Sequence, residues 1–323
     1  MKKRLLSGIQ PSGTMHLGNY FGAIKQFVDL QDQYDSFVFI ADFHALTTVQ
    51  DKEALSKYTL NVAMDYLACG LDPEKVTLFK QSDIPEVTEL TWYFNCLTTV
   101  PYLERAVSYK DANQKAKEVT VGLFDYPILM AADILIEDAD VVPVGADQKQ
   151  HIEYARDTAL KFNNAYGETF KLPEPLILDH VAVVPGTDGR KMSKSYGNTI
   201  PLFGTDDEIK KAVMSIVTDS KSPEEPKDPE SCNIFALHKL FLSGTELESL
   251  RKRYTDGGIG YKESKDMLVS EIIATVSPMR EIRKTFENNP AHVIEILTKG
   301  AQKAHVHVTE KMKTIRARVG IAH

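Results

Sequence analysis

The sequence predicts an α/β protein, with a Rossmann-like parallel sheet followed by a helical C-terminal domain. Three observations lead to this prediction. Short apolar runs that suit buried parallel strands alternate with longer segments whose apolar residues recur at helical spacing. Polar, glycine-bearing loops separate them, as in α/β folds. From about residue 200 helical spacing prevails, so we expect the α/β domain over residues 1–200 and the helical domain over residues 201–323.

The first hundred residues are expected to supply three strands, each followed by a helix. The run 4–9 ends in the turn-rich sequence Gln-Pro-Ser-Gly, and helical spacing begins at Leu17. Residues 37–41 are continuously apolar, as is typical of a buried parallel strand. A helical pattern over 55–69 stops at Gly70. A third strand is expected over 76–79, and another helix near 86–97.

The remainder of the chain continues the alternation once and then becomes helical. We expect a helix over 126–135, a fourth strand over 141–145 and a helix over 148–162. The segment 222–229, rich in proline and charge, predicts a surface connection. The pattern is almost wholly helical from Asn233, apart from the glycine-rich stretch 256–260. The final helix is amphipathic and basic, and we expect it to pack back on the α/β domain.

Composition excludes several classes of protein. The chain has 323 residues, of which 43% are hydrophobic and 26% charged, as in ordinary globular proteins. No apolar run approaches the ~20 residues of a membrane-spanning helix, and the N-terminus does not have the pattern of a signal peptide. The three cysteines form no CxxC pair, which argues against a zinc site and suits a reducing cytoplasm. A net charge of −7 argues against a surface that is basic throughout.

The segment from Pro11 to Asn19 lies where the first strand leads into the first helix. In parallel α/β sheets, ligands bind beyond the carboxyl ends of the strands, at such loops. Gly13 allows a tight turn, and Gly18 allows a flat ring to approach the helix backbone. His16 and Asn19 are neighbours on one helical face, and both can donate hydrogen bonds to phosphate oxygens. The alternative interpretation is an ordinary capped helix start, and the glycine spacing is not that of a P-loop.

A second glycine-bearing loop covers residues 186–195 and carries Arg190, Lys191 and Lys194. Flexible backbone and clustered ammonium groups suit a loop that closes over a polyphosphate. Its charges would stabilise the negative charge that develops on a leaving pyrophosphate. A solvated basic loop is the alternative interpretation.

Together the two motifs resemble the signatures of class I aminoacyl-tRNA synthetases. His16-Leu17-Gly18-Asn19 stands in place of their HIGH signature, and residues 191–195 are identical to their KMSKS signature. The order of the motifs and their separation by an α/β domain are more specific than either motif alone. The resemblance implies an enzyme that activates an amino acid with ATP and loads it onto tRNA.

Nearly the whole chain further resembles bacterial tryptophanyl-tRNA synthetases, through segments 7–13, 18–20, 130–135 and 142–151. His16 departs from many bacterial members, which carry Thr there, and Ala146 replaces an often acidic residue. The resemblance implies a cytoplasmic homodimer that uses L-tryptophan, ATP and tRNA(Trp) and releases AMP and diphosphate. It implies Mg²⁺ held through the ATP phosphates, and neither a protein-bound metal nor an organic cofactor. Residues 201–323 would bind the anticodon.

The resemblance also assigns roles to individual residues. The expected catalytic residues are His16, Asn19, Lys191 and Lys194. The residues expected to bind ATP are Gln10, Pro11, Ser12, Gly18, Asn19, Gly145, Ala146, Asp147, Val183, Lys191, Met192, Ser193, Lys194 and Ser195. Those expected to bind tryptophan are Gly8, His44, Tyr126, Met130, Asp133 and Gln148. Lys115 and Lys117 are expected to be solvated.

The amino-acid preference has a physical basis in the expected helix 126–135. Tyr126, Met130 and Asp133 fall on one face of that helix, among apolar neighbours. A buried carboxylate there requires a hydrogen-bond donor. An indole N–H group only donates, and Asp133 supplies an acceptor for it. The alternative is an Asp that caps or salt-bridges within the helix.

Three other functions remain open from the sequence. A tyrosyl-tRNA synthetase shares the fold and both signatures, and a phenol also donates to an Asp. A small-molecule nucleotidylyltransferase begins with a similar motif but does not need the helical domain. A non-catalytic paralogue that binds RNA or senses an amino acid would gain little from an intact phosphate loop.

Overall fold

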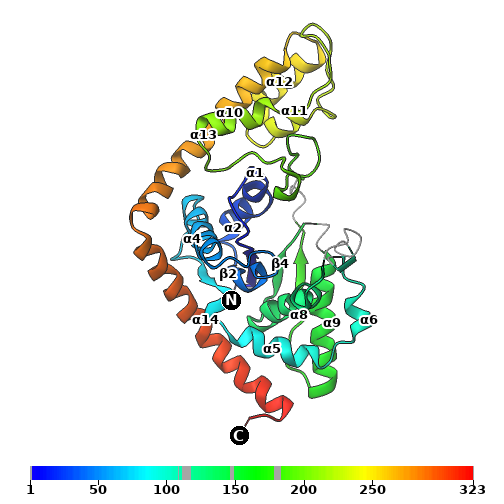
Figure 1. Ribbon diagram of the computed structural model, residues 1–323, viewed down its shortest axis with the longest axis vertical. Coiled ribbons are helices and arrows are strands. Elements are labelled where there is room, and N and C mark those ends of the chain that lie inside the picture. Colours follow the sequence, from blue (N-terminus) through cyan, green and yellow to red (C-terminus); the bar gives the residue numbers. More distant parts are fainter. Residues whose placement is uncertain (1, 108, 111–117, 146–148, 178–182, 323) are drawn as a thin grey trace.

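The computed structural model describes residues 2–107, 109–110, 118–145, 149–177 and 183–322 (Figure 1). Within them, five parallel strands form one sheet in the order β3-β2-β1-β4-β5. The pairing of β1 with β2 runs from Arg4 opposite Asp35 to Ile9 opposite Ile40. The predicted α/β fold class is therefore confirmed. The strands are β1 (Arg4–Ile9), β2 (Asp35–Ile40), β3 (Thr77–Lys80), β4 (Val141–Pro143) and β5 (Glu174–Leu176).

The sequence pattern predicts four of these strands and misses β5. β5 is three residues long and contains Pro175, so it has neither the length nor the composition of a recognisable strand. It exists because it pairs with β4, from Val141 opposite Glu174 to Pro143 opposite Leu176. The predicted strand 141–145 is also shorter in the structure, where β4 ends at Pro143.

The helices of the α/β part follow the strands in the expected alternation. The helix after the first motif includes a wider, π-type segment, which an apolar spacing pattern does not reveal. α8 begins before the predicted residue 126, because the Thr120 side chain accepts a hydrogen bond from the Leu123 N–H and caps its start. The elements are α1 (Leu17–Asn19), η1 (Tyr20–Ile24), α2 (Lys25–Leu30), α3 (Asp42–Ala45), α4 (Lys52–Ala68), η2 (Gln81–Asp83), α5 (Glu86–Asn95), α6 (Val100–Leu103), α8 (Val121–Ile136), α9 (Lys149–Tyr166) and η4 (Lys194–Tyr196).

The last third of the chain is helical, and its final helix returns to the sheet. α13 packs on α4, α10 and α11, and α14 lies along α4 and β3. In Figure 1 these two long helices form a bowed column, orange and then red, along one side of the α/β part. The elements are α10 (Asp206–Met214), α11 (Asn233–His238), α12 (Gly244–Thr255), α13 (Tyr261–Asn288) and α14 (Pro290–Val319).

The close approach of α14 to β3 depends on Gly300. A Cβ atom at this position would lie 1.9 Å from the main-chain oxygen of Leu78, so only glycine fits without movement. β3 is an edge strand of the sheet. α14 therefore covers an edge that would otherwise be open to pairing with another chain.

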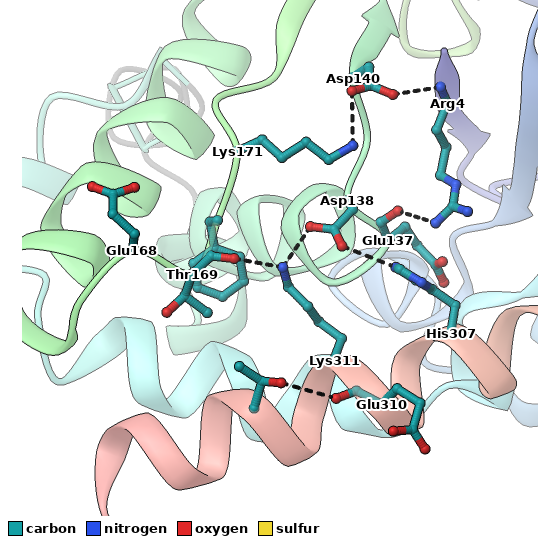
Figure 2. A network of polar contacts seen from close by, with 12 residues as sticks. Arg4, Glu137, Asp138, Asp140, Glu168, Thr169, Lys171, His307, Glu310 and Lys311 are labelled. Atoms are coloured by element: carbon teal, nitrogen blue, oxygen red, sulfur yellow. Dashed lines mark hydrogen bonds and ion pairs between the residues drawn. The ribbon is translucent and has the colours of Figure 1, made fainter. Parts of the chain in front are cut away.

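A network of polar contacts fixes the C-terminal half of α14 to the connection between α8 and β4 (Figure 2). The Lys311 ammonium group lies 2.6 Å from an Asp138 carboxylate oxygen and 2.7 Å from the main-chain oxygen of Thr169. His307 approaches the other Asp138 oxygen at 3.4 Å. Asp138 has a positive φ of 51°, which is uncommon for a residue other than glycine. Tertiary contacts from α14 thus hold a turn whose local conformation is unfavourable.

No helix in the part of the chain that the structure describes has the length and apolar character to cross a membrane.

Candidate active site

A cavity of 580 Å³ opens at the carboxyl ends of the strands. β1 contributes Gly8 to its lining and Gln10 directly follows that strand, the segment after β2 contributes His44, and Gly145 follows β4. The strand order turns back between β1 and β4, and parallel α/β sheets bind ligands at such a point. A larger cavity of 880 Å³ lies between α4 and α14 and does not include the ends of β1 and β4.

Asp133 lies in the cavity wall as a buried carboxyl group that accepts hydrogen bonds from two side chains. It is 4% exposed. One of its oxygens lies 3.0 Å from His44 Nε2, and the Gln81 amide nitrogen lies 2.9 Å from both oxygens. Burial raises the pKa of Asp133, and the hydrogen bonds from His44 and Gln81 oppose this rise. The two donors fix the direction of the carboxyl group and help to keep it ionised.

Gln81 is a site residue that the sequence does not reveal. It is 1% exposed and lies directly after β3. Its side-chain oxygen accepts hydrogen bonds from the main-chain N–H groups of Phe43 and His44, at 3.1 and 3.3 Å. Because its amide nitrogen bonds Asp133, Gln81 joins the segment after β2 to α8. Its strand-end position was the only signal in the sequence, and Gln81 shares no motif with its partners.

Aromatic and thioether side chains form the wall next to Asp133. Tyr126 and Met130 line the cavity with it, so the structure brings together the three residues predicted to share a helical face. The Tyr126 hydroxyl lies 3.1 Å from the ring nitrogens of His151, and the Tyr126 ring meets the His44 ring edge-on at 5.9 Å. His151 belongs to a segment that the sequence analysis singled out, but it was not predicted as a site residue.

His16 of the first motif is buried beneath the second motif, the lysine-rich loop of residues 186–195. His16 is 6% exposed, and its main-chain N–H donates to the Asn19 side chain at 3.2 Å. Burial, together with the nearby Lys194 charge, lowers the pKa of His16 to about 4. The imidazole is therefore neutral at physiological pH and acts as a hydrogen-bonding group rather than a cation.

The lysine-rich loop lies directly on the first motif, although 170 residues or more separate them. The Met192 sulfur accepts a hydrogen bond from the Gly18 N–H at 3.3 Å, and the Lys194 ammonium group lies 3.5 Å from the Ser12 hydroxyl. The strand-like pairing of Leu17 with Ile200 supports this contact, with 3.0 Å between nitrogen and oxygen. Desolvation lowers the pKa of Lys194, while the Asp65 carboxylate opposes the shift.

Asn198 organises the lysine-rich loop and was not predicted. Its side-chain oxygen accepts from the Ser193 N–H at 2.8 Å, and its amide nitrogen donates to the main-chain oxygen of Lys191 at 3.1 Å. Asn198 is 2% exposed. A Cβ atom on Gly186 would lie 2.2 Å from the Asn198 amide nitrogen, which explains the glycine there. The loop therefore has a defined shape, and is more than a solvated basic segment.

The remaining predicted residues occupy varied places. Gln10 donates from its amide to the main-chain oxygen of His44 and to the Thr48 hydroxyl, both at 3.1 Å. Pro11 is buried, whereas Ser12, Lys191 and Ser195 are exposed, and Val183 is exposed before the buried Val184. Ala146, Asp147, Gln148, Lys115 and Lys117 lie outside the described residues. Among the described residues, no group of histidine, cysteine and carboxylate side chains is arranged to hold a metal ion.

The arrangement thus has two parts, which suit two ligand groups. The cavity offers apolar and aromatic walls with one oriented carboxyl acceptor, which suits a flat ring bearing an N–H group. The neighbouring loops offer a neutral imidazole, main-chain N–H groups and lysines, which suit a polyphosphate. Main-chain hydrogen bonds of Leu17 with Ile200 and of Met15 with Leu202 hold the lysine-rich loop next to the first motif, beside the cavity.

Comparisons with known proteins agree with this division. The family model described as tRNA synthetases class I (W and Y) matches residues 1–277. The chain is 53% identical over 320 residues to a tryptophan–tRNA ligase of Fusobacterium nucleatum subsp. nucleatum, covering 99% of this chain and 98% of that protein. A Rhodopirellula baltica tryptophan–tRNA ligase is 49% identical, with 98% and 99% covered.

A solved structure gives the same result. The crystal structure of tryptophanyl-tRNA synthetase from Campylobacter jejuni complexed with ADP and tryptophan superimposes with a TM-score of 0.91 at 50% identity. The match covers 98% of this chain and 99% of that one. The similarity therefore extends through both the α/β and the helical parts.

Proposed function

The chain belongs to the class I aminoacyl-tRNA synthetases for tryptophan and tyrosine, and we propose that it acts there as a tryptophan–tRNA ligase. It activates L-tryptophan with ATP and transfers it to tRNA(Trp). The relatives that are about half identical over nearly their whole length are tryptophan–tRNA ligases. This observation favours tryptophan over tyrosine, and a ligase over a nucleotidylyltransferase or a non-catalytic binding protein.

Within the site, the environment of Asp133 is the observation that supports tryptophan as the substrate. The side chain is buried in the wall of a cavity with aromatic and apolar lining, and His44 and Gln81 hold its orientation. An ionised carboxyl group in that place accepts the indole N–H of tryptophan. Tyr126 and Met130 then pack against the ring. Gly8 and His44 also line this subsite, and Gln148 holds the ammonium group of the amino acid.

The activation step needs positioning and charge stabilisation rather than a protein nucleophile. The tryptophan carboxylate attacks the α-phosphorus of ATP, the bond to the β-phosphate oxygen breaks, and pyrophosphate leaves with that oxygen. His16 and Asn19 hold the phosphates from the helix side, and Lys191 and Lys194 stabilise the leaving charge from the loop. Mg²⁺ enters with ATP and is bound through its phosphates.

The remaining predicted contacts surround the nucleotide. Gln10, Pro11, Ser12 and Gly18 line it from the first motif, and Gly145, Ala146 and Asp147 from the segment after β4. Val183, Met192, Ser193 and Ser195 complete the site on the loop side. The 2′-hydroxyl of the terminal tRNA ribose then attacks the adenylate carbonyl carbon, and AMP leaves.

We assign residues 1–200 to catalysis and residues 201–323 to recognition of the anticodon, in a cytoplasmic homodimer.

A set of exposed apolar side chains supports the dimer. They lie on α5, on and after α6, and at the start of α8, helices that pack against one another. The four residues are Trp92, Val100, Val107 and Val121, and each is more than half exposed. Such exposure is unusual for large apolar side chains on neighbouring elements. Trp92→Asp should therefore convert a dimer into a monomer in sedimentation equilibrium, and a wild-type protein that sediments as a monomer would contradict this assignment.

The test of the function is exchange of pyrophosphate into ATP, driven by each amino acid in turn. Tryptophan should drive exchange, and charging of tRNA(Trp) should follow. Asp133→Asn should weaken the apparent affinity for tryptophan by about tenfold to a hundredfold, since it removes a hydrogen bond to a charged acceptor, and should leave the KM for ATP unchanged. Exchange driven by tyrosine alone would refute the assignment, and exchange by neither would favour a non-catalytic binding protein.

A further inference from the structure

A second carboxyl group is buried next to Asp133, and the function proposed above does not use it. Glu137 follows Asp133 by one helical turn, at the end of α8, and is 2% exposed. Neither of its carboxyl oxygens has a hydrogen-bond partner within the described residues. Figure 2 shows that Arg4 reaches the main-chain oxygen of Glu137, at 2.7 Å, and not its carboxyl group. A carboxyl group in this situation is costly for the fold, so its retention requires an explanation.

A small cavity connects the two carboxyl groups. Its volume is 10 Å³, about the space that one water molecule needs. Its polar lining consists of Gln81, Asp133 and Glu137, and the rest is apolar: Leu6, Phe39, Phe79, Ile84, Val87 and Ile136. The cavity therefore offers a water molecule polar partners in an otherwise dry environment. The same Asp133 also lines the substrate cavity.

Burial, together with three nearby carboxylates, favours the neutral form of Glu137. Burial raises its pKa to about 8; the carboxylates of Asp133, Asp138 and Asp35 act in the same direction, and Arg4 opposes them. Two further elements bring titratable groups to these neighbours: His44 after β2 reaches Asp133, while His307 and Lys311 of α14 reach Asp138. A neutral Glu137 carries an O–H group, which is a hydrogen-bond donor.

We propose that Glu137 is a positioning residue for tryptophan recognition, and that it acts on Asp133 through one water molecule in this cavity. Glu137 donates its O–H to the water, and the water donates to Asp133, which stays ionised and accepts the ring N–H of the substrate. The inference rests on the proposed function, since it requires Asp133 to bind the indole group. It adds a specificity-determining residue that does not touch the substrate.

The proposal gives tryptophan binding a distinct pH dependence. When Glu137 loses its proton, it can no longer donate a hydrogen bond to the water, and two like charges lie one helical turn apart. The water then loses the donor that orients it, and it no longer positions Asp133 for the ring N–H of the substrate. Affinity for tryptophan should therefore fall as the pH rises through about 8, by about fivefold between pH 8 and pH 9 if only the neutral form of Glu137 supports binding.

The test is calorimetric titration of the full-length protein with L-tryptophan, without ATP, from pH 5.5 to 9. Ionisation of free tryptophan affects the wild-type and variant measurements equally. The difference between their pH profiles of affinity therefore reports on the protein alone. Glu137→Gln keeps a donor but cannot ionise, and should match the wild type at pH 7 and lose the alkaline fall. Glu137→Leu removes the donor, so its affinity should be about tenfold weaker across the range, without an alkaline fall.

A matched control lies on the same helix. Burial also raises the pKa of Asp125, but its partner is Asn95 and it does not line either cavity. Asp125→Asn should keep the wild-type profile. An alkaline fall that persists in Glu137→Gln would overturn the proposal, and so would wild-type affinity in Glu137→Leu. If the Leu variant does not fold, the Gln variant alone decides. A wild-type protein that binds no tryptophan would instead refute the proposed function.

Discussion

At the scale of single residues, His16 shows how the fold changes the chemistry that a side chain brings to a site. A histidine near phosphates suggests a cation, yet this one is buried beneath the lysine-rich loop and has a pKa lowered to about 4. Its neutral ring can donate one hydrogen bond, and the positive charge of the site comes from the lysines.

The lowered pKa of His16 predicts an acid-sensitive fold. A histidine whose folded-state pKa lies below the unfolded value of 6.5 binds its proton more readily when the chain is unfolded. Stability is therefore fully present above about pH 6.5 and is lost as the pH falls towards 4, by at most roughly 3 kcal/mol. In urea denaturation, His16→Gln should lose less stability than the wild type between pH 7 and pH 4.5. The exposed His292→Gln should behave like the wild type, and equal pH slopes for all three proteins would contradict this explanation.

Lys194 is, with Met192, one of the residues through which the lysine-rich loop contacts the first motif. Its ammonium group lies 3.5 Å from the Ser12 hydroxyl, at the place proposed for the phosphates. Lys194→Ala should lower kcat for pyrophosphate exchange by about 10²-fold or more, because it removes a charge contact made in the transition state. The KM for tryptophan should change little. Lys210→Ala, which removes an exposed lysine from α10, serves as the control, and equal rates for the two variants would exclude Lys194 from catalysis.

At the scale of secondary-structure elements, the contact between α14 and β3 shows a helix shaped by its neighbour. Glycine is a poor residue for the interior of a helix, and α14 carries Gly300 where the Leu78 main-chain oxygen leaves no room for a Cβ atom. The sequence alone would rank this glycine as a weakness of the helix. In the structure it is the residue that lets α14 lie on the sheet edge.

Gly300→Ala should therefore destabilise the protein although it improves helix propensity. The propensity gain of about 1 kcal/mol is smaller than the cost of moving α14 away from the strand, which is about 1–3 kcal/mol or more. Gly122→Ala is the matched change, because a Cβ atom there meets only the Thr47 methyl group at 3.8 Å. Thermal unfolding should show a lower Tm for the Gly300 variant and an unchanged or higher Tm for the Gly122 variant. A raised Tm for Gly300→Ala would show that α14 adjusts freely.

At the scale of the whole molecule, α14 joins the helical part and the α/β part into one unit. It starts beside the helical part, passes α4 and β3, and ends at the polar network around Asp138 (Figures 1 and 2). That network lies close in sequence to both Asp133 and β4. The C-terminal helix therefore supports α8, which carries Asp133 and whose C-cap is Glu137. The helical part is thus mechanically connected to the substrate cavity.

Lys311→Met should weaken this connection. The Lys311 side chain is 11% exposed, and its removal takes the donor from one Asp138 carboxylate oxygen and from the Thr169 carbonyl, while His307 still approaches the other Asp138 oxygen. We expect a loss of about 2–3 kcal/mol in the free energy of unfolding measured with urea. Lys313→Met removes an exposed lysine two residues away, paired only with Glu310, and should change stability by less than about 0.5 kcal/mol. Equal effects of the two substitutions would mean that the network does not stabilise the fold.

The sequence by itself determined the fold class, most strands and helices, and the positions of the two motifs that we propose bind phosphates. These features are local, because periodicity, glycine spacing and charge clustering can be recognised within a window of a few residues. The face that carries Tyr126, Met130 and Asp133 is of the same kind, since helix geometry alone relates residues three and four apart. The residue assignments within the nucleotide subsite, and the domain boundary at residue 200, remain predictions.

Only the tertiary structure decided which distant groups complete these local features. Gln81 donates a hydrogen bond to Asp133, 52 residues further along the chain, and the Met192 sulfur accepts one from the Gly18 N–H, 174 residues away. β5 exists only because it pairs with β4. Glu137 is the clearest case. In the sequence it is one acidic residue among several at a helix end, and burial beside Asp133 is what makes it a neutral donor. Burial and partnership between distant residues arise when the chain folds, so a single sequence carries no local signal for them.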